Sequence, residues 1–190
     1  ENRSKEVKCV YVSSAAPYKH QWHVVNAIKI LRDEGIPVSL TLVGGGSGYS
    51  QKRLDKEIQL SDPTGIFVTQ YSFIHIDNIP RVLSESDLFI FASSCENMPV
   101  TLIEGMASGL PIACSDRGPM PEVLGDGGVY FNPENPQSIA DAVKMIIDNK
   151  DLRAKGIEVS KEISNQYLWK INSEKTFQFL TETIQKNEQN

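Results

Sequence analysis

Short apolar runs alternate with longer helical patterns along the chain, and this alternation most constrains the fold. The runs are nearly continuous in apolar residues, as is typical of strands buried on both faces of a parallel sheet. We expect six strands, at 8–14, 38–44, 65–71, 87–93, 111–115 and 128–131. Helical patterns are found at about 20–34, 50–60, 79–85, 100–108, 136–149, 151–165 and 171–186, with a short turn near 120–124. The alternation predicts right-handed βαβ units and one doubly wound, Rossmann-like α/β domain with helices on both faces.

The composition fits a single domain. The 190 residues are 40% hydrophobic, which is enough for one full core, and no Gly/Ser- or Pro-rich linker divides them. The net charge of −5 argues against a nucleic-acid-binding surface. No apolar run approaches the ~18–20 residues that span a bilayer, and the opening "ENRSKEV" shows no apolar leader. We therefore expect a cytoplasmic domain without a transmembrane segment.

The cysteines do not indicate a metal centre. Cys9, Cys95 and Cys114 lie in or beside apolar strand patterns, so we expect buried, reduced thiols. The chain has no CxxC and no Cys/His cluster, and His20 and His23 lack a third ligand. No bound metal is expected.

Ligands of doubly wound sheets lie outside the carboxyl ends of the strands, near the topological switch point. The loops after the first five expected strands are 13–20, 44–48, 70–73, 93–99 and 115–122. In the second, "GGGSG", either a phosphate-facing backbone or a plain tight turn is possible. In the loop at 13–20, Lys19 stands close to a helix start. There it is either a cation that neutralises a phosphate or an ordinary surface lysine in contact with solvent.

Two glutamates, Glu96 and Glu104, stand eight positions apart around the start of the helix at 100–108. A carboxylate before a helix can cap it, and one in the first turns complements the helix dipole. Capping explains Glu104 poorly, because the small residues of "GMASG" after it indicate close packing, where a carboxylate needs a polar partner. A ligand's hydroxyl groups are the alternative partner.

The segment "E-N-M-P-V-T-L-I-E-G-M-A-S-G-L-P-I" resembles the Glu-x(7)-Glu signature of retaining glycosyltransferases of family 4 (group 1). "YVSSAAPYKHQWHVVNAI", "LTLVGGG", "EVLGDGGVYFNPENPQSIADAV" and "YLWKINSEKTFQFL" resemble its other segments, so the resemblance covers nearly the whole chain. Such enzymes have the GT-B fold, with two Rossmann-like domains around the active site. Residues 1–190 match only the carboxyl-terminal, donor-binding domain, which implies an amino-terminal acceptor domain absent from this chain.

The resemblance also implies roles for residues. Glu96 and Lys19 would be catalytic, Glu96 facing the transferred hexose and Lys19 the departing diphosphate, while Glu104 would bind the ribose. The diphosphate would be held by backbone N–H groups at the start of the helix, those of Asn97, Met98, Val100 and Thr101. Pro99 is left out of this set because proline has no N–H. The remaining donor-binding positions implied by the resemblance are Ser14, Gly44, Gly45, Tyr71 and Phe73, of which Tyr71 and Phe73 lie where relatives hold the base.

One departure from the family concerns Ser14, which stands where an Arg usually precedes the Lys by five residues. The change removes a bidentate contact to the diphosphate. His20 replaces the usual Gly after the Lys and could partly compensate as a hydrogen-bond donor to the diphosphate. Ser14 keeps open whether catalysis is reduced or lost.

The function implied is transfer of a hexose, with retention, from a UDP- or GDP-sugar to a glycan, lipid or other acceptor, as in polysaccharide biosynthesis. No metal is required, and any contact with a membrane would be made through the absent domain. The alternatives are a GT-B nucleotide-sugar epimerase or phosphorylase, and a non-catalytic module that binds a nucleotide sugar. The isolated domain is expected to be inactive alone.

Overall fold

The fold is a parallel six-stranded sheet in a computed structural model that describes residues 6–188. The strands are β1 (Val7–Val12), β2 (Val38–Val43), β3 (Val68–Tyr71), β4 (Leu88–Phe91), β5 (Ile112–Ser115) and β6 (Val129–Phe131). They lie in the order β3-β2-β1-β4-β5-β6, and every neighbouring pair is parallel. The doubly wound, Rossmann-like prediction is confirmed. The opening residues 1–5 lie outside the described residues.

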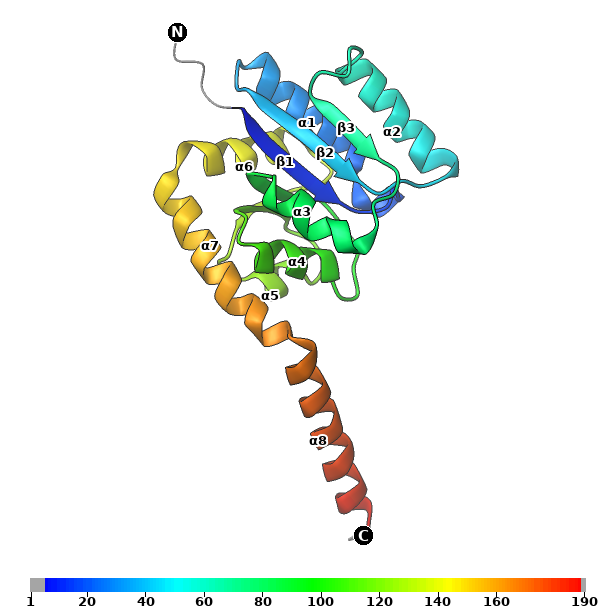
Figure 1. Cartoon of the computed structure of the whole chain (residues 1–190), viewed down its shortest axis with the longest axis vertical. Helices are drawn as coiled ribbons and strands as arrows, with labels where there is room; N and C mark the ends of the chain where they lie inside the picture. The colour runs from blue at the N-terminus through cyan, green and yellow to red at the C-terminus, as the bar shows by residue number, and fades with distance from the viewer. Residues whose placement is uncertain (1–5, 189–190) are drawn as a thin grey trace.

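Helices cover both faces of this sheet (Figure 1). Helix α1 packs against α2 and α6 on one side, and α4 packs against α3, α5 and α7 on the other. The helices are α1 (Gln21–Asp33), α2 (Gly48–Ser61), α3 (Ile79–Ser84), α4 (Val100–Ser108), α5 (Met120–Leu124), α6 (Pro136–Asp148), α7 (Lys150–Ser164) and α8 (Trp169–Glu188), with 3₁₀ turns η1 (Pro17–Lys19), η2 (Ile76–Asn78) and η3 (Asn165–Tyr167). Seven of them lie close to the predicted helices, and α5 forms where a short turn was predicted.

The core lies between the sheet and its helices, and the central strands are buried on both faces. All four residues of β4, Leu88–Phe91, are buried, as the continuous apolar run predicts. Gly105 of α4 lies against this strand, since a Cβ there would come within 2.7 Å of the Phe89 ring. The small residue thus lets α4 approach β4 closely, which fixes where α4 begins relative to the sheet edge.

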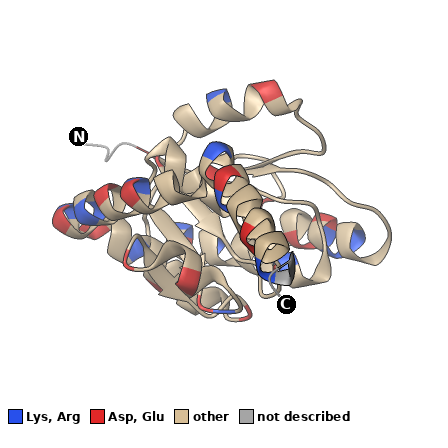
Figure 2. Ribbon diagram, turned by 90° about the horizontal axis from the view of Figure 1, so that it is seen from below, with Lys and Arg blue, Asp and Glu red and all other residues tan. Residues whose placement is uncertain are grey.

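Helix α8 extends away from the body of the molecule (Figure 1). It exposes several large apolar side chains, namely Trp169, Phe177, Phe179, Leu180 and Ile184. Among the described residues, no helix is both long and apolar enough to cross a membrane. Basic and acidic residues are interspersed along the surface helices (Figure 2).

The expectation of three buried thiols was wrong for one cysteine. Cys9 and Cys114 are buried, but Cys95 is exposed. The reason is the length of β4, which ends at Phe91 and leaves Cys95 in the loop beyond it. Burial raises the pKa of the Cys9 thiol to about 12 and raises that of Cys114 as well.

The strand order reverses direction between β1 and β4, which are neighbours although two strands separate them in sequence. This is the topological switch point, and the loops leaving β1 and β4 are those of Lys19 and Glu96. The fold therefore places the two candidate catalytic residues at the position where doubly wound sheets bind ligands.

Candidate functional site

Lys19 ends the short 3₁₀ turn that follows β1, and the structure places it inside the molecule. Its ammonium forms an ion pair with the carboxylate of Glu96, and the two side chains are only 10% and 15% exposed. The Tyr11 hydroxyl fixes the backbone by donating to the carbonyl oxygen of Lys19 at 2.8 Å. The ammonium also lies 5.4 Å from the Tyr18 ring centroid and 5.5 Å from that of Phe91. The solvated-lysine alternative is therefore wrong.

Glu96 belongs to the loop between β4 and α4 and does not cap the helix. The residue at the N-cap position of α4 is Pro99, and no side chain accepts from the first turn. The helix has no acidic residue in its first turn either, because Glu104 is its fifth residue. Capping therefore explains neither glutamate, and the contact made by Glu96 is the one with Lys19.

The backbone at the start of α4 differs in one respect from the predicted set of donors. Pro99 has φ −81° and ψ 71°, which is the conformation of an inverse γ-turn. The N–H of Val100 accordingly donates to the carbonyl of Met98 at 2.9 Å, so Val100 offers no free donor. The N–H groups of Asn97, Met98 and Thr101 donate to no atom of the described residues. These three remain available to an anion near a helix N-terminus.

Glu104 lies in a cleft rather than on the packed face of α4. That face belongs to Gly105 and Met106, whereas Glu104 lies at the rim, where its side chain is partly open to solvent and partly covered. The expectation that Glu104 is packed was therefore wrong. It lines a cavity of about 400 Å³ together with Ile79, Pro80 and other residues of α3. Partial burial here raises the pKa of its carboxyl group, which is the mark of a carboxylate without a protein partner in an apolar setting.

The glycine turn after β2 is explained by close packing against the loop after β1. Gly44 has φ 114°, and a Cβ on it would lie 2.3 Å from the carbonyl oxygen of Ser13. A Cβ on Gly45 would come within 3.1 Å of Ser72, and one on Gly46 within 2.6 Å of the Ala15 carbonyl oxygen. The glycines therefore bring three loops together at the same rim. Ser14 is exposed between them and brings no positive charge.

Two aromatic residues, one at the end of β3 and one in the loop after it, lie on the surface, as their predicted contact with a base requires. Tyr71 is 49% exposed and Phe73 is 78% exposed. Ile76, in the same loop, lines the cavity of Glu104. Exposed aromatic faces at this rim leave room for a planar ligand to stack.

Sequence reasoning missed the residues that fix the loop after β1 and join it to the loop after β4. Gln21 donates from Nε2 to both the carbonyl and the hydroxyl oxygen of Ser13, at 2.8 and 2.9 Å. The N–H of Ser94 donates to the carbonyl of Tyr18 at 2.8 Å, and the Ser94 hydroxyl meets Nε2 of His20 at 2.8 Å. His20 thus faces a protein partner rather than a ligand, and Nδ1 of His23 lies 3.0 Å from the carbonyl oxygen of Pro133.

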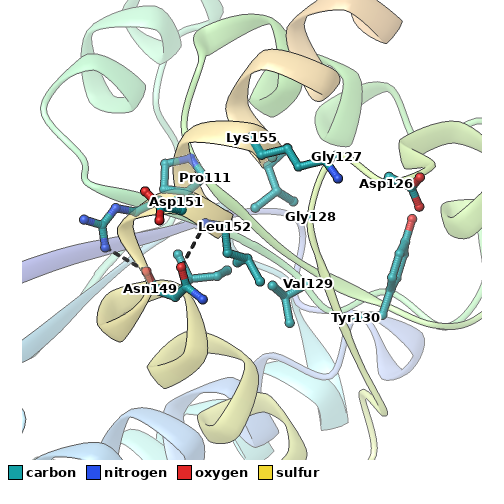
Figure 3. A pocket seen from close by; sticks show the side chains of 14 residues that line it. Pro111, Asp126, Gly127, Gly128, Val129, Tyr130, Asn149, Asp151, Leu152 and Lys155 are labelled. Atoms are coloured by element: carbon teal, nitrogen blue, oxygen red, sulfur yellow. Dashed lines mark hydrogen bonds between the residues drawn. The ribbon is translucent and has the colours of Figure 1, made fainter.

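A second cavity, of about 650 Å³, lies at the opposite edge of the sheet (Figure 3). It is lined by the amino-terminal ends of β5 and β6 and by the start of α7. Two of its polar side chains are paired: Asn149 accepts from the N–H of Leu152 at 3.0 Å, and Arg153 donates to the carbonyls of Ile146 and Ile147. We assign no ligand to it. Within residues 6–188, no group of three or more His, Cys, Asp or Glu side chains is placed to hold a metal ion.

Comparison with known proteins places this chain in a family. The family model described as glycosyl transferases group 1 matches residues 1–163. The O-antigen chain mannosyltransferase B of Escherichia coli is 21% identical over 159 residues, which are 82% of this chain and 42% of the relative. The chain therefore spans less than half the length of that relative.

Solved structures share the fold. HepE of Anabaena, in complex with UDP and glucose, has a TM-score of 0.80 at 20% identity and covers 93% of this chain, which spans 48% of it. The carboxyl-terminal domain of a glycosyl transferase group 1 family protein, LpcC of Francisella tularensis, has a TM-score of 0.72 at 19% identity, with 84% and 85% of the two chains covered. Because the family model matches most of the chain, we conclude that this chain belongs to the group 1 glycosyl transferases.

Proposed function

We propose that the chain is the carboxyl-terminal, donor-binding domain of a retaining glycosyltransferase of family 4, which takes a hexose from a UDP- or GDP-sugar. The observation that carries the proposal is the Lys19–Glu96 pair at the switch point of the sheet. The likeness to HepE with UDP and glucose supports the class of donor. The likeness to a carboxyl-terminal domain over 85% of its length supports the proposed place of the chain in a longer protein.

The proposed donor runs along the rim from the loop of Glu96 to α4. Its diphosphate meets the free N–H groups of Asn97, Met98 and Thr101 and competes with Glu96 for the ammonium of Lys19. Its ribose reaches Glu104, which lies on the order of 6 Å along the helix axis from Val100 at about 1.5 Å per residue. Its base stacks beside Tyr71 and Phe73, in the exposed loop that adjoins the cavity of Glu104.

In the proposed reaction, the bond between the anomeric carbon and the diphosphate oxygen breaks, and its electron pair leaves with the diphosphate. The acceptor's hydroxyl oxygen forms the new bond on the same face and gives up its proton, which the departing diphosphate accepts. Lys19 and the N–H groups of α4 stabilise the charge that grows on the leaving group. Glu96 accepts from the hexose hydroxyls and stabilises the positive charge near the reacting carbon.

A second function, a non-catalytic module that binds a nucleotide sugar, is favoured by Ser14. Where the family has a guanidinium, the structure has an exposed hydroxyl, so Lys19 is left as the cation of these loops. A single cation stabilises a leaving diphosphate less than two.

The test titrates UDP-, GDP- and ADP-sugars into this chain by calorimetry and assays transfer with the full-length protein. We expect one donor class to bind, transfer by the full-length protein with retained configuration, and no transfer by this chain alone, because the acceptor domain is missing. Binding without turnover by the full-length protein supports the non-catalytic module. If none of these sugars binds, both proposed functions are contradicted. Detection of an epimerised free nucleotide sugar would identify an epimerase, and release of the sugar by phosphate would identify a phosphorylase.

A further inference from the structure

His20 is the one residue other than glycine with a positive φ among residues 6–188, at 50°. A side chain makes this conformation costly, because Cβ approaches the backbone. His20 connects η1 to α1, and its carbonyl accepts from the N–H groups of His23 and Val24 at 2.9 and 3.2 Å. Because glycine would adopt this backbone conformation without strain, the presence of a histidine here indicates a role for its side chain.

The imidazole makes one hydrogen bond, to the loop that carries Glu96. Its Nε2 lies 2.8 Å from the Ser94 hydroxyl oxygen, and that oxygen lies 3.4 Å from the carbonyl of Tyr18. Nδ1 is buried and has no hydrogen-bond partner. If Nε2 carries the proton, it donates to Ser94, the Ser94 hydroxyl donates to Tyr18, and only a lone pair on Nδ1 is left unpaired. The other tautomer would bury an unpaired N–H, which is the less favourable arrangement.

The ring is also held in this orientation by its aromatic neighbours. It stacks on His23 with centroids 5.4 Å apart and an interplanar angle of 15°, and it meets the Trp22 ring edge-on at 6.3 Å. Nδ1 of His23 lies 3.0 Å from the carbonyl of Pro133, and the Arg53 guanidinium lies 4.2 Å from the Trp22 ring centroid. These contacts leave His20 little freedom to turn toward a ligand.

We propose that His20 is a positioning residue, whose Nε2–H bond to Ser94 holds the loop of Lys19 against the loop of Glu96. Lys19 is its neighbour in sequence, and Glu96 lies two residues beyond Ser94, so the bond and the ion pair join the same two loops side by side. The role rests on the proposed function of the site. It requires that His20 act through Lys19 and not by touching the donor.

The test is a double-mutant cycle on this chain, read by calorimetric titration of UDP and GDP. Ser94→Ala and His20→Gly each remove the bond, and glycine keeps the positive φ without strain. We expect each to lower affinity for the bound diphosphate on the order of threefold, as for a lost neutral hydrogen bond. In a Lys19→Ala background, we expect the same changes to have no further effect. Ser173→Ala, which alters an exposed serine of α8, serves as the matched control and leaves affinity unchanged.

The outcomes separate this proposal from the function on which it rests. If His20→Gly and Ser94→Ala lower the affinity equally with and without Lys19, His20 acts independently of Lys19 and the proposal is overturned. The proposal is also overturned if neither variant lowers the affinity. Binding of neither UDP nor GDP by the wild-type chain contradicts the proposed function itself. Melting curves of each variant show whether it is folded, and nitrogen NMR shifts of His20 test the bond directly, with the Nε2–H form expected and the Nδ1–H form contradicting it.

Discussion

Lys19 and Glu96 are 77 residues apart in sequence and form a largely buried ion pair that joins the loops leaving β1 and β4. Each residue is the other's charged partner in this site, and each is also expected to contact the donor. The diphosphate must therefore displace Glu96 from Lys19 in part, which leaves the carboxylate free to accept from the hexose. In the proposed site, the pair thus links binding of the donor to placement of the carboxylate.

The first prediction concerns the stability of this pair. Removing one partner from a mostly buried pair leaves an uncompensated charge, so Lys19→Met or Glu96→Gln should each lower the free energy of unfolding by about 1–3 kcal/mol. The double variant should lose less than the sum of the two. Urea denaturation measures all three, with the exposed pair Lys29–Asp33 of α1 as the control, for which changes within about 0.5 kcal/mol are expected. Additive losses at Lys19 and Glu96 would contradict a direct pairing.

The second prediction separates binding from stability at Glu104. Burial raises the pKa of this carboxyl group in the folded protein. The folded chain therefore holds the proton more tightly than the unfolded chain, and stability falls as pH rises from the unfolded pKa through the raised one. Glu104→Gln should melt at a higher temperature than the wild type at pH 7 and at about the same temperature near pH 4.

The same variant should bind the nucleoside diphosphate on the order of tenfold more weakly, because a charged acceptor to the ribose is lost. Melting curves and titrations test both effects, with the exposed Glu158→Gln of α7 as the control. A capping role predicts the reverse pattern, with lower stability and unchanged affinity. Equal affinity of Glu104→Gln and the wild type would remove Glu104 from the donor site.

The third prediction tests the close approach of the glycine turn. Gly44→Ala places a Cβ 2.3 Å from the carbonyl oxygen of Ser13 at a φ of 114°. Gly35→Ala is the matched control, because its φ is 84° but no atom lies within 4 Å of the added Cβ. The control should cost only the backbone strain, roughly 1–2 kcal/mol, and Gly44→Ala should cost clearly more in urea denaturation. Equal costs would show that the two loops can separate freely.

A fourth prediction concerns Asp62, whose carboxylate accepts hydrogen bonds from the backbone at the start of β3 and just before it. It is 3% exposed and accepts from the N–H groups of Ile66, Phe67 and Val68 at 2.7–2.9 Å. Burial alone would raise its pKa, but these hydrogen bonds outweigh burial and lower it. The stabilisation is therefore present above the unfolded pKa and is lost as pH falls through the lowered one.

Asp62→Asn should lower the free energy of unfolding at pH 7 by about 1.5–3 kcal/mol, as for lost hydrogen bonds to a charged group. The difference from the wild type should shrink as the pH falls below 4, where the wild-type carboxylate takes up its proton. Urea denaturation at several pH values measures this, with the exposed Asp148→Asn as the control. A difference that does not change with pH would show that the charge of Asp62 is not involved.

The fold follows from local pattern, whereas much of the site depends on distant contacts. The apolar run of Leu88–Phe91 is readable because burial on both faces leaves a mark in the sequence. The glycines after β2 are compatible with a tight turn or with a phosphate-facing backbone, and only the structure shows their close contacts with the loop after β1. The pairing of Lys19 with Glu96 requires the strand order, which places β1 beside β4. The backbone at Pro99 decides that Val100 is no donor, and residue spacing carries no sign of that turn.

The central claim is that a nucleoside diphosphate binds at the rim with its phosphates on Lys19. Its most direct test is calorimetric titration of UDP and GDP into the wild-type chain, into Lys19→Ala and into the control Lys29→Ala. The wild type and the control should bind at least one of the two with equal affinity. Lys19→Ala should lose on the order of tenfold or more, because a charged donor is removed and the unpaired Glu96 then repels the phosphates. Binding of neither diphosphate, or equal affinity of the wild type and Lys19→Ala, would contradict the claim.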